Sequence, residues 1–266
     1  MLGTLVAIHI GGIGAECDKP TAMAVAEQAL VLMEHIGHVM SAHDPASDLG
    51  RLSRAMPLEV LELDPHTVHV LRATQYWTHR SGGAFNPACA GDALARRGAR
   101  PGLNAKISEQ SNMTGIEILS ERLVRMSVPL SLDFGGIAKG YAVDQAAACL
   151  KHHGVSVALI NAGGDIRVVG RQNWAVDIRH AGVHLRDRVF LADTRMAESA
   201  LATSAATATD FVRTTVRGAR QWRSASVLAR DCMTADVLTK WALQSSLLCP
   251  SLKSALREHG ARMWRT

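Results

Sequence analysis

Apolar residues recur along this chain at two spacings, which predict helices in some segments and strands in others. Across residues 21–42 they return every three or four positions, as on the buried face of an amphipathic helix. A second helix is predicted over residues 65–80, because Asp64 and Pro65 form a favourable N-cap and first turn and two glycines lie just beyond its end. These two helices account for much of the first third of the chain.

Strands are predicted where apolar residues alternate or form short runs between turn residues. The predicted strands cover residues 4–10, two short segments within 115–132, and then 155–160, 166–169, 174–179 and 224–229. Three more helices are expected, from the turn at 135–140 to about 153, from 231 to about 248, and over 253–259. Because strands and helices mix without a regular βαβ repeat, the expected fold class is α+β.

The composition excludes several classes of protein. Of the 266 residues, 47% are hydrophobic and 20% are charged, which is not the composition of a disordered chain. Aromatic residues make up only 4%, too few for binding by repeated base stacking, so no nucleic-acid partner is expected. The five cysteines form no CxxC pair, which argues against a disulfide framework and against a structural zinc site.

Neither a transmembrane segment nor a targeting segment is expected. No apolar run approaches the roughly 18 residues of a membrane-spanning helix. The N-terminal residues lack the basic region and cleavage site of a signal peptide and form the first predicted strand instead. A cytoplasmic location is therefore expected, with a periplasmic one left open if a leader was trimmed. The formal net charge of +5 suits an anionic ligand such as a phosphate ester.

The stretch most informative about chemistry is residues 132–144. A predicted strand delivers Asp133, two glycines follow, and a helix then begins with Lys139 in its first turn. Glycines allow a ligand to approach the backbone, and a helix start offers free N–H groups to a phosphate. The pattern is neither a Walker A motif nor a clean GxGxxG motif. Two interpretations stay open: a phosphate site, or a tight strand-to-helix turn with a surface lysine.

Three other stretches carry candidate residues with equally plain structural interpretations. Phe85 follows the end of a predicted helix and either touches a planar ligand or belongs to the core. Residues 161–165 read as an ordinary hairpin turn. Asp236, Thr239 and Lys240 lie within about one helical turn, so they either converge on one ligand or line an exposed helix. No HExxH or GxSxG motif is present.

Taken together, these stretches resemble the ApbE family, whose members are FAD:protein FMN transferases. The matching segments, in chain order, are residues 2–4, 81–86, 132–144, 161–167, 202–204 and 234–239. The resemblance spans nearly the whole chain, and its most specific part is residues 132–170. It implies a single ApbE-like domain over residues 1–266, with a mixed fold of antiparallel sheets and packed helices.

The resemblance implies an activity as well as a fold. Such enzymes bind FAD as substrate, split its pyrophosphate with Mg²⁺, and join FMN through a phosphoester bond to a Thr or Ser of an acceptor protein. Two alternatives accompany this expectation. One is a flavin-binding family member without transferase activity, serving as a carrier or assembly factor. The other is an FAD pyrophosphatase, which needs the same metal site but no protein acceptor.

The resemblance further implies which residues form the site. The flavin-binding positions correspond to Leu2, Ala84, Phe85, Asn86, Asp133 and Lys139. The implied metal ligands are the backbone carbonyl of Gly136, the Asp236 carboxylate and Thr239, and the implied catalytic residues are Asp236 and Lys240. Such a set fits the chemistry, because Mg²⁺ takes hard oxygen ligands and neutralises charge on the phosphates that are separated.

This chain departs from the family pattern at several positions. The family usually has Thr where this chain has Lys240, and an ammonium group cannot ligate Mg²⁺. Three interpretations of Lys240 stay open. It contacts a phosphate, it leaves the metal with fewer protein ligands, or it is a solvated residue and Thr239 lies at the metal instead. Residues 205–223 lack the family's His-Ile-x-Asp-Pro-x-Thr-Gly segment. Asn86 replaces a commoner Asp, which removes one charge near the ligand.

Overall fold

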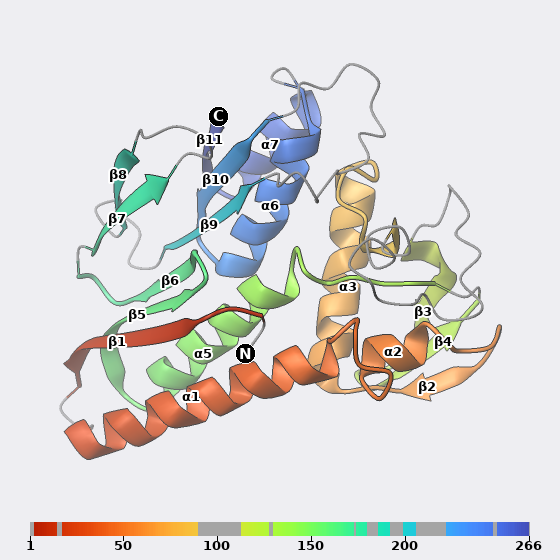
Figure 1. The fold of residues 1–266 in the computed structure, drawn as a ribbon, viewed down its shortest axis with the longest axis horizontal. Helices are drawn as coiled ribbons and strands as arrows, with labels where there is room; N and C mark the ends of the chain where they lie inside the picture. The colour runs from red at the N-terminus through yellow and green to blue at the C-terminus, as the bar shows by residue number, and fades with distance from the viewer. Residues whose placement is uncertain are drawn as a thin grey trace. The chain divides into compact units, whose positions relative to one another are not determined.

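The computed structural model describes residues 3–14, 18–89, 113–127, 130–172, 174–179, 186–191, 199–205, 222–246 and 249–265 (Figure 1). It is a mixed structure of helices and antiparallel sheets, so the predicted α+β class is confirmed. The chain divides into two compact units, Met1–His35 with Lys139–Thr266, and Ile36–Ala138. Leu2, one of the predicted flavin-binding positions, lies outside the described residues.

A six-stranded antiparallel sheet is the framework of the first unit. In spatial order its strands are β1 (Val6–Ile13), β5 (Val155–Ala162), β6 (Asp165–Val169), β9 (Ala200–Ala205), β10 (Ser224–Ala229) and β11 (Arg262–Arg265). Antiparallel strands present alternate side chains to opposite faces, so one face can pack on helices while the other packs on a second layer. This alternation decides which residues of β6 and β9 reach the candidate site.

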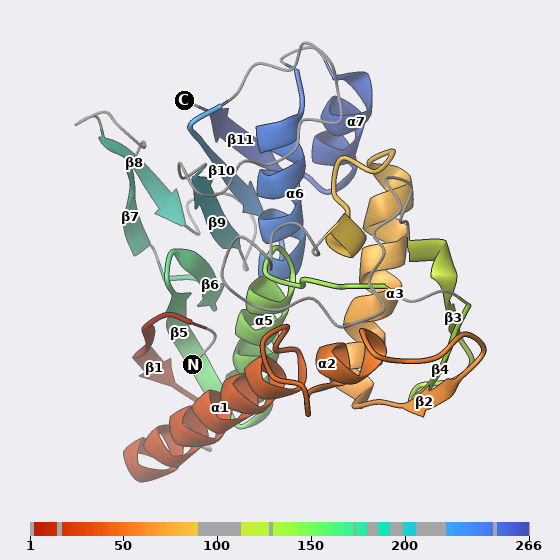
Figure 2. The ribbon, with the colours of Figure 1, turned by 45° about the vertical axis from the view of Figure 1, so that its right-hand side comes forward.

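Helix α6 (Cys232–Gln244) covers one face of this sheet, where it packs on β6, β9 and β10 (Figure 2). The helix is buried along most of its length, with Trp241 among the largest fully buried side chains. The other helices of this unit are α5 (Ala138–His152), α7 (Pro250–Glu258) and most of α1 (Lys19–Val39). The α6-facing side of the sheet therefore holds the polar residues discussed below.

The opposite face of the sheet packs against side chains of β7 (Trp174–Arg179), a strand that pairs antiparallel with β8 (Arg186–Leu191). A cluster of buried apolar side chains lies on this face, and partly buried apolar side chains pack against it. The core consists of Leu159, Ile166, Val168, Ile178, Leu201 and Leu228, with Trp174, Val176 and Trp264 packed against it. This layer stabilises the sheet by burying apolar surface and leaves the chemistry to the other face.

The described residues of the second unit include two helices and a three-stranded sheet. The helices are α2 (Asp48–Leu52) and α3 (Pro65–Arg80), and the antiparallel strands lie in the order β2 (Val60–Glu62), β4 (Leu123–Met126), β3 (Ile116–Ile118). Short 3-10 turns occupy Pro87–Cys89 and Met113–Gly115. Asp64 caps α3 as predicted, because its side chain accepts a hydrogen bond of 2.8 Å from the backbone N–H of His66.

The helices and the strands predicted from apolar spacing are present. The first strand extends beyond its predicted end, because β1 continues through two glycines to Ile13 with an irregular register against β5. Helix α6 ends at Gln244, earlier than the predicted residue 248, and residues 247–248 lie outside the described part of the chain. The sequence did not predict α2, β2, β8, β9 or β11. Within the described residues, no helix is both long enough and apolar enough to cross a lipid bilayer.

Helices α5 and α6 meet at a close backbone approach. A Cβ atom on Gly140 would lie 2.5 Å from the carbonyl oxygen of Cys232, at the first turn of α6. Asp144, one turn further along α5, accepts hydrogen bonds from the backbone N–H groups of Cys232 (2.9 Å) and Met233 (2.8 Å). Glycine and carboxylate together therefore fix where α6 begins, and with it the positions of the polar residues that α6 carries.

The Gly140→Ala substitution is expected to lower the free energy of unfolding by roughly 1–3 kcal/mol, because the added methyl group overpacks against the α6 backbone. Ala148→Ser, at an exposed position of the same helix, is the control and should lower the stability by no more than about 0.5 kcal/mol, the difference in helix propensity. Urea denaturation followed by circular dichroism measures both. Equal midpoints for Gly140→Ala and the wild type would contradict the close approach.

Candidate functional site

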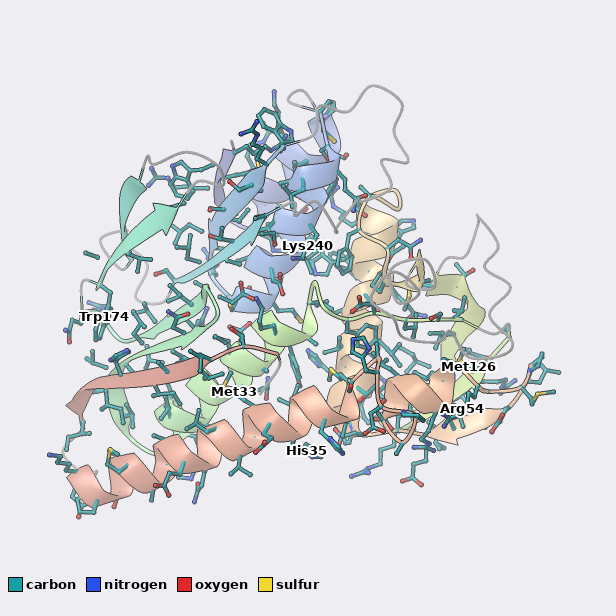
Figure 3. The ribbon with its side chains drawn as sticks, in the orientation of Figure 1. Met33, His35, Arg54, Met126, Trp174 and Lys240 are labelled. Atoms are coloured by element: carbon teal, nitrogen blue, oxygen red, sulfur yellow. The ribbon has the colours of Figure 1, made fainter. Side chains whose placement is uncertain are left out.

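Four charged side chains converge in the first unit, and we call them the four-charge cluster: Lys139, Asp165, Asp236 and Lys240. The Lys139 Nζ atom lies 2.8 Å from Asp165 Oδ2, and the Lys240 Nζ atom lies 3.9 Å from Asp236 Oδ1. Asp165 also interacts electrostatically with Asp236 and with Lys240. Lys240 lies on α6 in Figure 3. Three of the four are predicted site residues, and Asp165 is the addition.

The local structure places each of these side chains. Lys139 lies in the first turn of α5, and Asp236 and Lys240 lie on one face of α6, four positions apart. Asp165 opens β6 after a turn in which Gly163 and Gly164 have φ values of +60° and +99°. Glycine adopts this left-handed conformation without steric cost, so the turn can bring the Asp165 carboxylate to the α6-facing side of the sheet.

Three carboxylate oxygens of the cluster are buried without a hydrogen-bond partner among the described residues: Asp165 Oδ1, Asp165 Oδ2 and Asp236 Oδ2. Of these, Asp165 Oδ2 is ion-paired with Lys139, so Asp165 Oδ1 and Asp236 Oδ2 remain without a partner, and both side chains are only 1% exposed. An ionised carboxylate buried without compensation is costly, because it loses the water that solvates it. Lys139 pairs with Asp165 Oδ2, and the atom of Asp236 nearer to Lys240 is Oδ1. The two unpartnered oxygens are therefore suited to a further cation.

A chain of hydroxyl groups ties Lys240 to the helix that carries it. Thr239 Oγ1 donates to the Asp236 carbonyl oxygen at 2.7 Å, and Ser204 Oγ lies 2.6 Å from Thr239 Oγ1. Because the Thr239 proton is already directed to the carbonyl, Ser204 donates to Thr239. A lone pair of Ser204 is then left to accept from Lys240 Nζ at 2.6 Å. The Lys240 ammonium group is thus held against Ser204, a residue of β9.

The negative charges of Asp165 and Asp236 repel each other. Burial, followed by the charge of Asp236, raises the pKa of Asp165 to about 7, although Lys139 and Lys240 act in the opposite direction. Burial alone would lower the pKa of Lys139, but the charges of Asp165 and Asp236 outweigh it and raise that pKa. Lys139 therefore stays charged at neutral pH, while the charge of Asp165 changes near neutral pH.

The remaining predicted site residues belong to the second unit. Asp133 donates its backbone N–H to the Pro87 carbonyl at 3.0 Å, which brings the two predicted flavin-binding stretches together. The side chains of Ala84 and Phe85 are buried, in agreement with the interpretation that Phe85 belongs to the core. Asn86 accepts a hydrogen bond from the backbone of Ala88. Gly136 lies in the turn that precedes α5.

Sequence reasoning missed two residues of this site, Asp165 and Ser204. The local pattern indicated a hairpin turn at residues 161–165, and the turn is present. Residues 161–167 and 202–204 also matched the family, but neither Asp165 nor Ser204 was assigned a role in the site. The available signal was an acidic residue at the start of a strand that is apolar apart from Arg167, because a buried carboxylate needs a specific partner. In the described part of the chain, no group of three or more His, Cys, Asp or Glu side chains could hold a metal.

Comparison with known proteins identifies the family. The ApbE family model matches residues 2–246 of this chain. The chain belongs to the ApbE family. The predicted resemblance is therefore confirmed, and it extends over both compact units.

Two curated relatives of this ApbE chain carry the name FAD:protein FMN transferase. The protein from Rhodobacter capsulatus is 29% identical over 197 residues, covering 67% of this chain and 36% of the relative. The protein from Treponema pallidum is 24% identical over 205 residues, covering 67% of this chain and 56% of the relative. The chain thus spans between about a third and just over half the length of these relatives.

Solved structures of the family share the fold of this chain. The ApbE protein of Thermotoga maritima superposes with a TM-score of 0.78 at 23% identity, covering 99% of this chain and 91% of that one. The flavin transferase ApbE of Vibrio cholerae gives a TM-score of 0.76 at 21% identity, covering 99% and 90%. The ApbE-like mixed fold expected from the sequence is therefore confirmed.

The Asp165→Asn substitution is expected to stabilise the protein at pH 8 relative to the wild type, but not at pH 5. Between the ordinary pKa of 3.8 and the folded value of about 7, the folded wild type holds a proton that the unfolded chain has released. The free energy of unfolding of the wild type therefore falls as pH rises through this window. Asparagine has no proton to lose, so the difference between the two proteins should grow from pH 5 to pH 8.

Urea denaturation in EDTA, at both pH values, measures this difference. Glu117→Gln, which neutralises an exposed carboxylate, is the control and should show no such growth. A difference between Asp165→Asn and wild type that is the same at pH 5 and pH 8 would show that Asp165 titrates in its ordinary range.

Proposed function

We propose that this chain is an FAD:protein FMN transferase, which cleaves FAD with Mg²⁺ and attaches FMN through a phosphoester bond to a Thr or Ser of an acceptor protein. Family membership and the names of the curated relatives support the reaction class. The observation that carries the proposal is the four-charge cluster, in which Lys139, Asp236 and Lys240 stand at family-matched positions.

The donor set in the first unit fits a divalent cation. Asp165 Oδ1 and Asp236 Oδ2 are buried carboxylate oxygens without a described hydrogen-bond partner, and hard oxygen ligands are what Mg²⁺ prefers. We therefore propose both oxygens as metal ligands, with water and phosphate oxygens completing the shell. Thr239 is a weaker candidate than the sequence indicated, because its hydroxyl group is shared between Ser204 and a carbonyl. The role of Gly136 rests on the resemblance alone.

The chain's own side chains supply charge and position. Lys139 presents an ammonium group in the first turn of α5, where the backbone N–H groups of a helix start also attract phosphate. Asp165 orients that ammonium at 2.8 Å. Bound Mg²⁺ would neutralise charge on the diphosphate as it is cleaved. In the proposed transfer, the acceptor hydroxyl oxygen bonds to the FMN phosphorus, its proton is released, and AMP leaves.

Replacing Asp133 or Lys139 by alanine is expected to weaken FAD binding by roughly 1–3 kcal/mol each, the range for the loss of a hydrogen bond to a charged group. Lys151→Ala removes an exposed lysine near the other end of α5 and is the matched control. Calorimetric titration of FAD measures the affinities. If both variants bind FAD as tightly as Lys151→Ala does, the flavin does not bind at these residues.

The Asp236→Asn substitution is expected to abolish Mg²⁺-dependent turnover of FAD, because it removes the charge of a proposed metal ligand while keeping its shape. The assay incubates protein, FAD, Mg²⁺ and a candidate acceptor, and mass spectrometry follows both the acceptor and the nucleotides. Circular dichroism checks that the variant is folded. Activity that survives this substitution, or that survives EDTA, would contradict the proposed metal-dependent mechanism.

The same assay separates the transferase from its two alternatives. A transferase adds the mass of FMN to the acceptor and releases AMP. A pyrophosphatase releases FMN and AMP and leaves the acceptor unchanged. A carrier binds FAD and returns it intact. The absence of the family's His-containing segment from residues 205–223 is the sequence feature that makes this comparison informative.

A further inference from the structure

Lys240 introduces an electrostatic conflict into the proposed metal site. Its ammonium group and a divalent cation would both approach the carboxylate of Asp236, and two cations at close range repel each other. A lysine stem is long and flexible, so its charged end can occupy many positions unless something holds it. Whether a metal cation can bind at Asp236 therefore depends on where the Lys240 Nζ atom is held.

The anchor in the structure is the hydroxyl group of Ser204. Lys240 Nζ lies 2.6 Å from Ser204 Oγ, at hydrogen-bond distance, but 3.9 Å from Asp236 Oδ1. The Ser204 side chain is itself fixed, because it is buried and donates to Thr239, which in turn donates to the Asp236 carbonyl. The ammonium group is thus directed to a neutral oxygen on β9 and is not in direct contact with either unpartnered carboxylate oxygen.

We propose that Ser204 is a positioning residue for the metal site. It holds the Lys240 ammonium group off the Asp236 carboxylate, so that Asp165 Oδ1 and Asp236 Oδ2 stay open to a divalent cation. The inference rests on the proposed function, because it takes these two oxygens as metal ligands. Ser204 acts through Lys240 and touches no metal itself.

The neighbouring residue on β9 provides a matched control. Thr203 faces the opposite side of the sheet, where its hydroxyl lies 2.9 Å from Ser226 Oγ. Thr203→Ala therefore removes a hydroxyl group and one hydrogen bond from the same strand without affecting Lys240. Any effect of Ser204→Ala that is due only to weakening β9 should also appear in Thr203→Ala.

The test measures metal binding directly, with Mn²⁺ as a paramagnetic probe whose free-ion signal is followed by electron paramagnetic resonance. In the metal-free protein, Ser204→Ala should weaken Mn²⁺ binding by roughly tenfold, because the freed ammonium group pairs with Asp236. Lys240→Met, which keeps an apolar stem and removes the charge, should tighten binding. The double variant should bind like Lys240→Met, since Ser204 has no ammonium group left to position. Ser204→Thr, which keeps the hydroxyl, should bind like the wild type.

Three results would overturn the proposal. The first is wild-type affinity in Ser204→Ala, and the second is a Ser204→Ala effect of the same size in the Lys240→Met background. The third is weaker binding in Lys240→Met than in the wild type, which needs no variant of Ser204 and so does not depend on that variant's folding. If Asp236→Asn binds Mn²⁺ as tightly as the wild type, the proposed metal ligand itself is wrong, which separates failure of the proposed function from failure of the Ser204 role.

Discussion

The burial of two neighbouring carboxylates, Asp165 and Asp236, is the constraint on which the rest of this site depends. Each is 1% exposed, and the charge of Asp236 raises the energetic cost of ionising Asp165. A pair of like charges in a dry environment persists only where cations or protons compensate it. Lys139 pairs with one oxygen of Asp165 at 2.8 Å, whereas Lys240 stays 3.9 Å from the nearer oxygen of Asp236. The two remaining carboxylate oxygens, Asp165 Oδ1 and Asp236 Oδ2, are suited to a ligand that carries positive charge.

Three elements of the fold, β6, α5 and α6, bring these four charged side chains together. Asp165 comes from a glycine turn on β6, Lys139 from the start of α5, and the other two from α6. The start of α6 is fixed in turn by Asp144, which accepts two of its free N–H groups. Burial raises the pKa of Asp144 to about 6, while Arg167 and the donated N–H groups oppose that rise. A partly buried carboxylate, that of Asp144, thus positions the helix that carries the buried carboxylate of Asp236.

Sequence reasoning succeeded where the determinant of structure is local. The start of α3 follows from Asp64 and Pro65 alone, and the turn before β6 follows from its glycines. It failed for β9, whose Ala, Leu, Thr and Ser residues are extended because β6 and β10 pair with them on both sides. It also missed Ser204, because nothing near that residue in the sequence indicates a lysine on α6. Tertiary pairing supplied what the local pattern does not contain.

The departure at Lys240 illustrates why a family resemblance alone cannot describe this site. Exchanging a neutral hydroxyl for an ammonium group adds a full positive charge beside a proposed metal ligand, which is unfavourable unless the new charge is directed elsewhere. In this chain it is directed to Ser204, which belongs to a different element and is oriented by the residue adjacent to Lys240. The substitution and its anchor have to be considered together. A lysine at this position without a hydroxyl group on β9 would neutralise Asp236 rather than share the site with a metal.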